Sequence, residues 1–214
     1  SDNSTVETIA VTDSKITGTG TTEITINPSA TLASLTGYYL TIAATAFDDS
    51  CSNSYAGITD ATTLNFTTVD VNAPTLSSST PADGATGVAV DANIVLTFSE
   101  AVDRESGNIV IKKTSDNSTV ETIAVTDSKI TGTGTTTITI NPSSTLASST
   151  GYYLTIDATA FDDGSGNSYA GISVATTLNF TIADVNAPTL SSSTPSDGAT
   201  GVAVDANIVL TFSE

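Results

Sequence analysis

The feature that most constrains this chain is a long internal repeat. Residues 1–100 recur as residues 115–214 at a constant offset of 114, and the copies differ only at positions 23, 30, 35, 43, 50, 51, 52, 59, 60, 68, 69 and 82. A period of 114 residues is longer than the roughly 20–50 residues of solenoid repeats and matches one small domain of about 100 residues. The two lobes of a duplicated enzyme usually diverge in sequence, so near-identical tandem units favour a chain whose role is to provide length.

A proline-containing joint marks the boundaries of the repeat. The sequence Asp-Val-Asn-Ala-Pro occurs at 70–74 and again at 184–188. Proline at these points ends a strand ladder and biases its neighbour toward extended geometry. We therefore expect the C-terminal part of one repeat at 1–70, a complete repeat at 71–184 and the N-terminal strands of the next at 185–214.

The last of these pieces is too short to fold alone. It has 30 residues, which is below the practical floor of about 40 residues for a buried core. Either the chain is a window from a longer polymer, or the final strands complete the fragment at the other end of a neighbouring copy. The sequence leaves both alternatives open.

Short segments of alternating apolar and polar residues fill the complete repeat. In 92–98, for example, Ile94, Leu96 and Phe98 share one face of a half-buried strand. Tyr152 is expected in the core and Tyr153 on the opposite face of its strand. The predicted strands are 75–79, 92–98, 108–112, 119–125, 136–140, 152–158 and 177–182. About seven short strands without helical periodicity predict an all-β fold, an antiparallel β-sandwich.

The charge balance excludes several classes of function. The chain has 23 Asp and Glu against 5 Lys and Arg, for a net charge of −18, and it has no His. Nucleic-acid binding requires clusters of Lys and Arg, and a membrane span requires about 20 apolar residues, so neither is expected. Without His or a matched nucleophile and base, we also expect no enzyme. The single Cys51 can form no internal disulfide, and its counterpart is Ser165.

Two stretches resemble a known family. Residues 73–88 with 94–100 look like the opening of the bacterial Ig-like domains found in S-layer proteins and giant tandem surface adhesins. Residues 160–171 resemble the Asp-x-x-Gly-Asn loop that precedes the last strand of that family. The resemblance covers the whole 114-residue unit and implies tandem Ig-like antiparallel β-sandwiches, with about seven strands in each repeat. It implies an extracellular spacer or adhesive stalk at the bacterial cell surface, often stiffened by Ca²⁺.

The loops of such a sandwich suggest where calcium would bind. Alternate loops fall at the same pole, so the joint, the loop after the second strand and the loop before the last strand should meet there. Ca²⁺ takes six to eight oxygen ligands from such carboxylates, amides and carbonyls. The expected ligands are Asp70, Asn72, Glu100, Asp103, Asp162, Asp163 and Asn167. The competing interpretation is that these are ordinary solvated acidic loops and turns.

The partial copies carry parts of the same set. In the first copy the candidates are Asp48, Asp49 and Asn53, with the Cys51 thiol replacing a hydroxyl, and thiols are poor ligands for a hard cation. In the last copy they are Asp184, Asn186 and Glu214. Joining the last copy of one chain to the first copy of another would restore the set. Such a composite would still lack the counterpart of 101–114.

Two functions from different classes remain at this point. The first is a structural repeat whose partners are neighbouring copies of itself, arranged head to tail in a stalk or polymer with Ca²⁺ at the joints. The second is an adhesive module that binds a glycan or protein through one pole or through a tyrosine-bearing face.

Overall fold

The computed structural model describes residues 3–214, and these residues form strands and loops without a helix. No helix within this range is long and apolar enough to cross a membrane. The described chain divides into two compact units. The first runs through Ala73 and includes Asp163–Asn167, and the second comprises Pro74–Asp162 with Ser168–Glu214.

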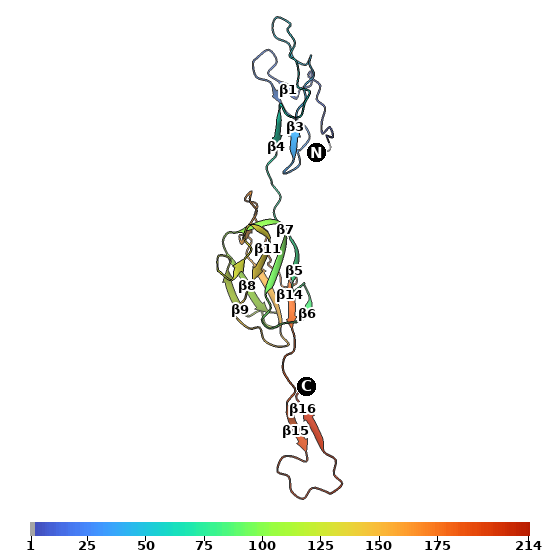
Figure 1. The fold of residues 1–214 in the computed structure, drawn as a ribbon, viewed down its shortest axis with the longest axis vertical. Helices are drawn as coiled ribbons and strands as arrows, with labels where there is room; N and C mark the ends of the chain where they lie inside the picture. Colours follow the sequence, from blue (N-terminus) through green and yellow to red (C-terminus); the bar gives the residue numbers. More distant parts are fainter. Residues whose placement is uncertain (1–2) are drawn as a thin grey trace. The chain divides into compact units, whose positions relative to one another are not determined.

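Residues 74–183 form a β-sandwich, which we call the central domain; of these residues, only the loop Asp163–Asn167 is grouped with the first unit. Its first sheet has the order β10-β11-β7-β13, with β5 also paired to β7, and its second has the order β6-β14-β12-β8-β9. Figure 1 shows β7 in green beside β11 and β5. The strands are β5 (Leu76–Thr80), β6 (Ala85–Val88), β7 (Ile94–Arg104), β8 (Asn108–Lys113), β9 (Thr119–Ala124), β10 (Ile130–Thr131), β11 (Thr135–Ile140), β12 (Gly151–Ile156), β13 (Phe161–Asp162) and β14 (Asn179–Ile182).

The core of the central domain lies between these two sheets. Alternation in β7 places Ile94, Leu96 and Phe98 inward, as predicted, and each is almost fully buried. The second sheet adds the inward residues of β8, β12 and β14, and all belong to one hydrophobic cluster. The predicted all-β sandwich is confirmed, although β6 and β14 pair in parallel while the other pairs are antiparallel.

Strand β7 corrects one prediction. The sequence pattern ends this strand at Phe98 and places Glu100 and Asp103 in a loop, but β7 continues to Arg104. The strand changes partners along its length: its first half pairs with β5 and its last residues pair with β13. Thr97 lies opposite Thr137 and Val102 lies opposite Thr135, so β7 advances five residues while β11 advances two. The extra residues of β7, which include Glu100, form a bulge, and a bulge interrupts the alternating pattern in the sequence as a loop does.

The same sequence forms far less structure in the head segment (residues 3–69). Its strands are β1 (Ile16–Thr17), β2 (Thr25–Ile26), β3 (Gly37–Tyr39) and β4 (Asn65–Thr67), paired as β1-β2 and β3-β4. These correspond to β10-β11 and β12-β14 of the central domain at the offset of 114. The head segment contains no counterpart of residues 75–113, so the strands that would pair with its edges are missing from it.

The tail segment (residues 185–214) repeats the opening of the central domain. It forms an antiparallel hairpin of β15 (Leu190–Thr194) and β16 (Val209–Phe212). Leu190 lies opposite Phe212, as Leu76 lies opposite Phe98 in the β5-β7 pair. Leu190, Val209 and Phe212 of this hairpin are exposed.

Candidate metal centre

The loop between β13 and β14 is organised around the carboxylate of Asp163. Asp163 Oδ1 accepts the backbone N–H groups of Ser165 and Asn167, each at 2.8 Å, and Oδ2 accepts Asn167 Nδ2 at 2.8 Å. The bridge between Asp162 and Ser168 closes the loop. The Asn167 amide, with these backbone N–H groups, holds the pKa of Asp163 below its usual range even though burial opposes this shift. Asp163 is therefore a largely buried, ionised carboxylate.

The joint contacts the same loop. Asn167 Nδ2 donates a 3.2 Å hydrogen bond to the backbone carbonyl of Asp70. The Asp70 carboxylate itself accepts the Ser34 hydroxyl at 2.9 Å and the Asn72 N–H at 3.0 Å. The first of these bonds anchors Asp70 to the head segment, and the second forms a tight Asx turn at the joint.

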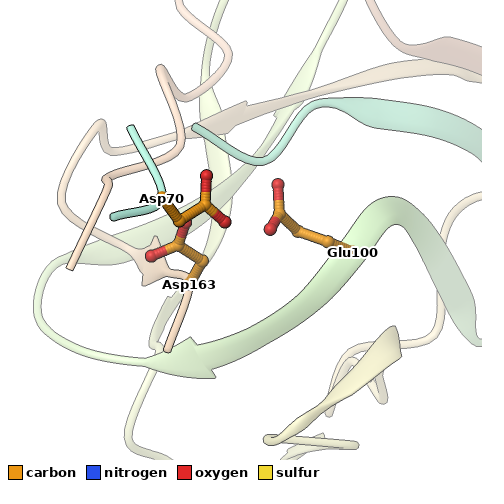
Figure 2. A group of neighbouring side chains, drawn as sticks. All are labelled: Asp70, Glu100 and Asp163. Atoms are coloured by element: carbon orange, nitrogen blue, oxygen red, sulfur yellow. The ribbon is translucent and has the colours of Figure 1, made fainter. Parts of the chain in front are cut away.

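Three carboxylates come together at this point. Asp70, Glu100 and Asp163 each offer one oxygen, and the three oxygens lie within 4.8 Å of one another (Figure 2). Oxygens that bind one Ca²⁺ at about 2.3–2.6 Å lie at most about 5.2 Å apart. The three oxygens thus fit within one coordination sphere, and carboxylates are the ligands that this cation prefers. The remaining ligands would have to come from carbonyls or water.

Comparison with known proteins assigns the fold to a family. The family model described as "Bacterial Ig-like domain" matches residues 70–182 and 184–214. The chain belongs to the bacterial Ig-like domain family. The first match begins at Asp70, so it spans all three clustered carboxylates.

Curated proteins and solved structures add little to this family assignment. No curated protein matches the chain significantly. Among solved structures, the crystal structure of the S-layer protein rSbsC(31-844) is similar to the Ig-like chain, with 15% sequence identity and a TM-score of 0.36. The similarity covers 57% of this chain and 16% of that one.

Other predicted ligands of the Ig-like domain have different surroundings. Asp103 lies opposite Asp162 in the β7-β13 pair, and its carboxylate accepts the Thr133 hydroxyl at 3.1 Å. Asp162 Oδ1 is buried without a hydrogen-bond partner. Neither Asp103 nor Asp162 belongs to the three-carboxylate group. Asn72 is exposed.

The first copy reproduces the loop but not the cluster. Asp49 accepts the N–H groups of Cys51 and Asn53 and the Asn53 amide, as Asp163 does in the central domain. Asp48, Asp49 and Asn53 are all exposed. Within residues 3–214, no group of three acidic side chains forms at this loop. The head segment has no counterpart of β7, and therefore none of Glu100.

The last copy repeats two of the three clustered carboxylates: Asp184 corresponds to Asp70 and Glu214 to Glu100. Asp184 Oδ1 accepts the Asn186 N–H and the Ser148 hydroxyl, each at 3.0 Å, and these bonds lower the pKa of Asp184. The Asp184 carboxylate in turn raises the pKa of Glu214, because two nearby anions repel each other. Asn186 Nδ2 also donates to the Ser148 hydroxyl, at 3.1 Å. A bound cation would relieve the repulsion between Asp184 and Glu214.

Sequence reasoning missed the serines of this arrangement. Ser34 and Ser148 occupy equivalent positions, and each donates its hydroxyl to the joint aspartate that follows it by 36 residues. Each serine hydroxyl also accepts the N–H of the valine that follows this aspartate, Val71 or Val185. The exact repetition of Ser34, Asp70 and Val71 at an offset of 114 was the available signal, but serines are too common in this chain to single out.

Proposed function

We propose that this chain is a structural repeat of an extracellular bacterial surface stalk, adhesin or fibre. In this proposal it is not an enzyme: its Ig-like domains act as beads, short linkers join them, and Ca²⁺ stiffens the linkers. Neighbouring copies are its partners, and they complete one another head to tail. Membership in the bacterial Ig-like domain family supports the surface role, and the near-identity of the tandem copies supports a role in providing length.

The observation that carries the calcium proposal is the convergence of Asp70, Glu100 and Asp163. Asp70 belongs to the joint, whereas Glu100 and Asp163 follow in the sequence of the domain that the joint precedes. An ion that takes an oxygen from each would fix the joint and would replace repulsion among three anions with attraction. The internal hydrogen bonds of Asp163 do not exhaust its carboxylate, which has about four lone-pair sites.

Calcium titration with thermal unfolding tests the calcium proposal. If the dissociation constant is about 10⁻⁴ M, as in extracellular modules, about 10 mM Ca²⁺ adds about 2.7 kcal/mol to the free energy of unfolding. The melting temperature should rise in Ca²⁺ and fall in EDTA. Glu100→Gln and Asp70→Asn should weaken calcium binding measured by calorimetry, whereas Asp91→Asn, an exposed acid outside the cluster, should leave it unchanged.

Stiffening is a separate readout. Backbone ¹⁵N relaxation of Val71 and Asn72 should show reduced motion in Ca²⁺ relative to EDTA at matched ionic strength. If Ca²⁺ and Na⁺ of equal ionic strength give the same melting temperature and the same relaxation, the calcium proposal is wrong.

The alternative of a glycan- or protein-binding module finds less support. Tyr153, the residue expected to offer a stacking face, is buried, and its hydroxyl donates a 3.0 Å hydrogen bond to Asn117 Oδ1. In the central domain this ring therefore serves packing. Saturable binding of a glycan to the full chain would revive the alternative.

A further inference from the structure

The side chain of Asn167 connects the loop before β14 with the joint. Its Nδ2 donates one hydrogen bond to Asp163 Oδ2, at 2.8 Å, and another to the backbone carbonyl of Asp70, at 3.2 Å. Asn167 and Asp70 are 97 residues apart in the sequence. All three residues belong to the same compact unit. One amide group therefore joins the carboxylate of the loop to the backbone of the joint.

The chemistry of an amide explains why asparagine suits this position. An amide nitrogen carries two hydrogens, whereas a carboxylate oxygen and a backbone carbonyl offer only lone pairs. The two bonds of Asn167 Nδ2 thus use one hydrogen for each acceptor. A reversed amide would turn its oxygen toward two acceptors. Asp at this position would do the same and would add a charge.

These bonds bear on the role of Asn167 in the candidate metal centre. The sequence predicted this residue as a direct ligand, and Ca²⁺ would have to take its oxygen. In the structure the amide nitrogen faces both Asp163 and the Asp70 carbonyl. The observed contacts therefore support an indirect role, in which Asn167 places the groups that surround the ion.

We propose that Asn167 is a positioning residue that holds the joint at Asp70 against the Asp163 loop before a cation binds. This deepens the calcium proposal and rests on it for the identity of the ion. The carboxylates of Asp70, Glu100 and Asp163 lie close together (Figure 2), and nearby anions repel one another. The two bonds from Asn167 offset part of this repulsion without adding charge. A site whose ligands are already in place needs less ordering when the ion binds.

The restraint from Asn167 is partial. Its bond to the joint is a single hydrogen bond of 3.2 Å between neutral groups, and water competes for both partners. The joint therefore keeps some motion without metal, and a bound ion removes more of it. At Asn72 and Ala73 we expect the most motion in variants without the amide, less in the parent chain in EDTA, and the least in the parent chain with Ca²⁺.

The first copy supplies a matched control. Asn53 is the equivalent residue, and its Nδ2 donates to Asp49 Oδ2 at 2.9 Å. Its backbone N–H and carbonyl also bond to Asp49, so among residues 3–214 its hydrogen bonds stay within its own loop. Asn53→Ala thus removes the bond within the loop and leaves the joint at Asp70 unaffected.

The first test is ¹⁵N relaxation of the full chain in EDTA, where no cation takes part. Asn167→Ala removes the amide, and Asn167→Asp keeps the shape but removes both hydrogens. In either variant the order parameters of Asn72 and Ala73 should fall below those of the parent chain, toward the value of about 0.6 that marks flexible backbone. Asp70→Asn keeps the backbone carbonyl and should leave them unchanged, as should Asn53→Ala.

The second test is calcium binding measured by calorimetry. Asn167→Ala should raise the dissociation constant about 10-fold or more, as is usual when a group that orients a metal ligand is lost. Asn53→Ala should leave it unchanged. Thermal unfolding in EDTA shows whether each variant keeps the folded central domain. If Asn167 were a direct ligand instead, Asn167→Asp would bind Ca²⁺ at least as tightly as the parent chain and would not loosen the joint in EDTA.

The outcomes separate this proposal from the calcium proposal. Order parameters in EDTA that stay at the parent values in both Asn167 variants would overturn it, whatever their calcium affinity. A lower melting temperature with an unchanged joint would also overturn it, because Asn167 would then serve only its own loop. If the parent chain binds no Ca²⁺, the calcium proposal fails, and the comparison in EDTA still decides whether Asn167 positions the joint.

Discussion

At the residue scale, the repeat supplies internal controls in which one side chain occurs in two environments. Phe180 contacts Tyr152, with ring centroids 6.3 Å apart, and is buried, whereas Phe66 is half exposed. Phe180→Ala should lower the free energy of unfolding of the central domain by about 3–5 kcal/mol, through lost burial and the cavity that remains. Phe66→Ala should leave that transition unchanged in chemical denaturation at low protein concentration. Equal effects of the two substitutions would contradict the difference in packing.

A second residue-scale prediction concerns Glu121. Its carboxylate accepts Lys129 Nζ at 2.9 Å and the N–H groups of Ser143 and Ser144. Burial raises the pKa of Glu121, but these donors outweigh it and leave the pKa below the usual 4.5. The bonds therefore stabilise the fold above about pH 4.5, and this contribution disappears as pH falls through the lowered pKa.

Glu121→Gln should accordingly cost about 1–3 kcal/mol at pH 7, and the difference from the parent chain should vanish in acid. The check is urea denaturation at several pH values. Glu7→Gln is the matched control, because Glu7 makes the equivalent contacts with Lys15, Ser29 and Ala30 in the head segment. That change should not alter the unfolding of the central domain at any pH.

The sequence indicated part of the candidate site at this scale. The topology of alternate loops predicted that the joint, the loop after the second strand and the loop before the last strand would meet. Asp70, Glu100 and Asp163 do lie together, although Glu100 lies within strand β7 and not in a loop. The Asp163 carboxylate also accepts the N–H groups of Ser165 and Asn167 in its own loop. Residue type and topology alone do not reveal these hydrogen bonds, because they depend on the direction in which the side chain points.

At the element scale, the β10-β11 hairpin depends on one glycine. Gly132 has φ of +98°, and a Cβ at this position would lie 2.0 Å from the carbonyl oxygen of Thr137. Gly132→Ala should therefore cost more than about 1 kcal/mol, because the backbone must shift. Gly164→Ala is the control, since it meets nothing within 4 Å and the equivalent position carries Ser50. Thermal unfolding of both variants checks this, and equal melting temperatures would contradict the prediction.

The elements also show what the sequence could predict. All seven predicted strands of the central domain are present, because alternation over five or more residues is a strong signal. Strands β6, β10 and β13 were not predicted, and they have only two to four residues. Segments this short have no measurable periodicity. In the head segment, identical residues fail to form the counterparts of β9 and β13, since the strands that pair with them are missing there.

At the scale of the whole molecule, the net charge of −18 opposes compaction. Raising NaCl from about 10 mM to about 0.5 M should increase the melting temperature, since the Debye length falls from about 30 Å to about 4–5 Å. Scanning calorimetry measures this effect and also sets the baseline for calcium. A melting temperature that falls with added salt would contradict self-repulsion as the dominant long-range term.

The parallel pairing of β6 with β14 matters for a chain that is pulled at its ends. One of these strands lies near the start of the central domain and the other at its end, so tension draws them in opposite directions along their shared axis. The bonds from Gly84 to Asn179 and from Ala183 to Val88 then resist in shear, together, rather than opening one after another. A surface appendage made of such units would stretch little under fluid drag until this clamp yields.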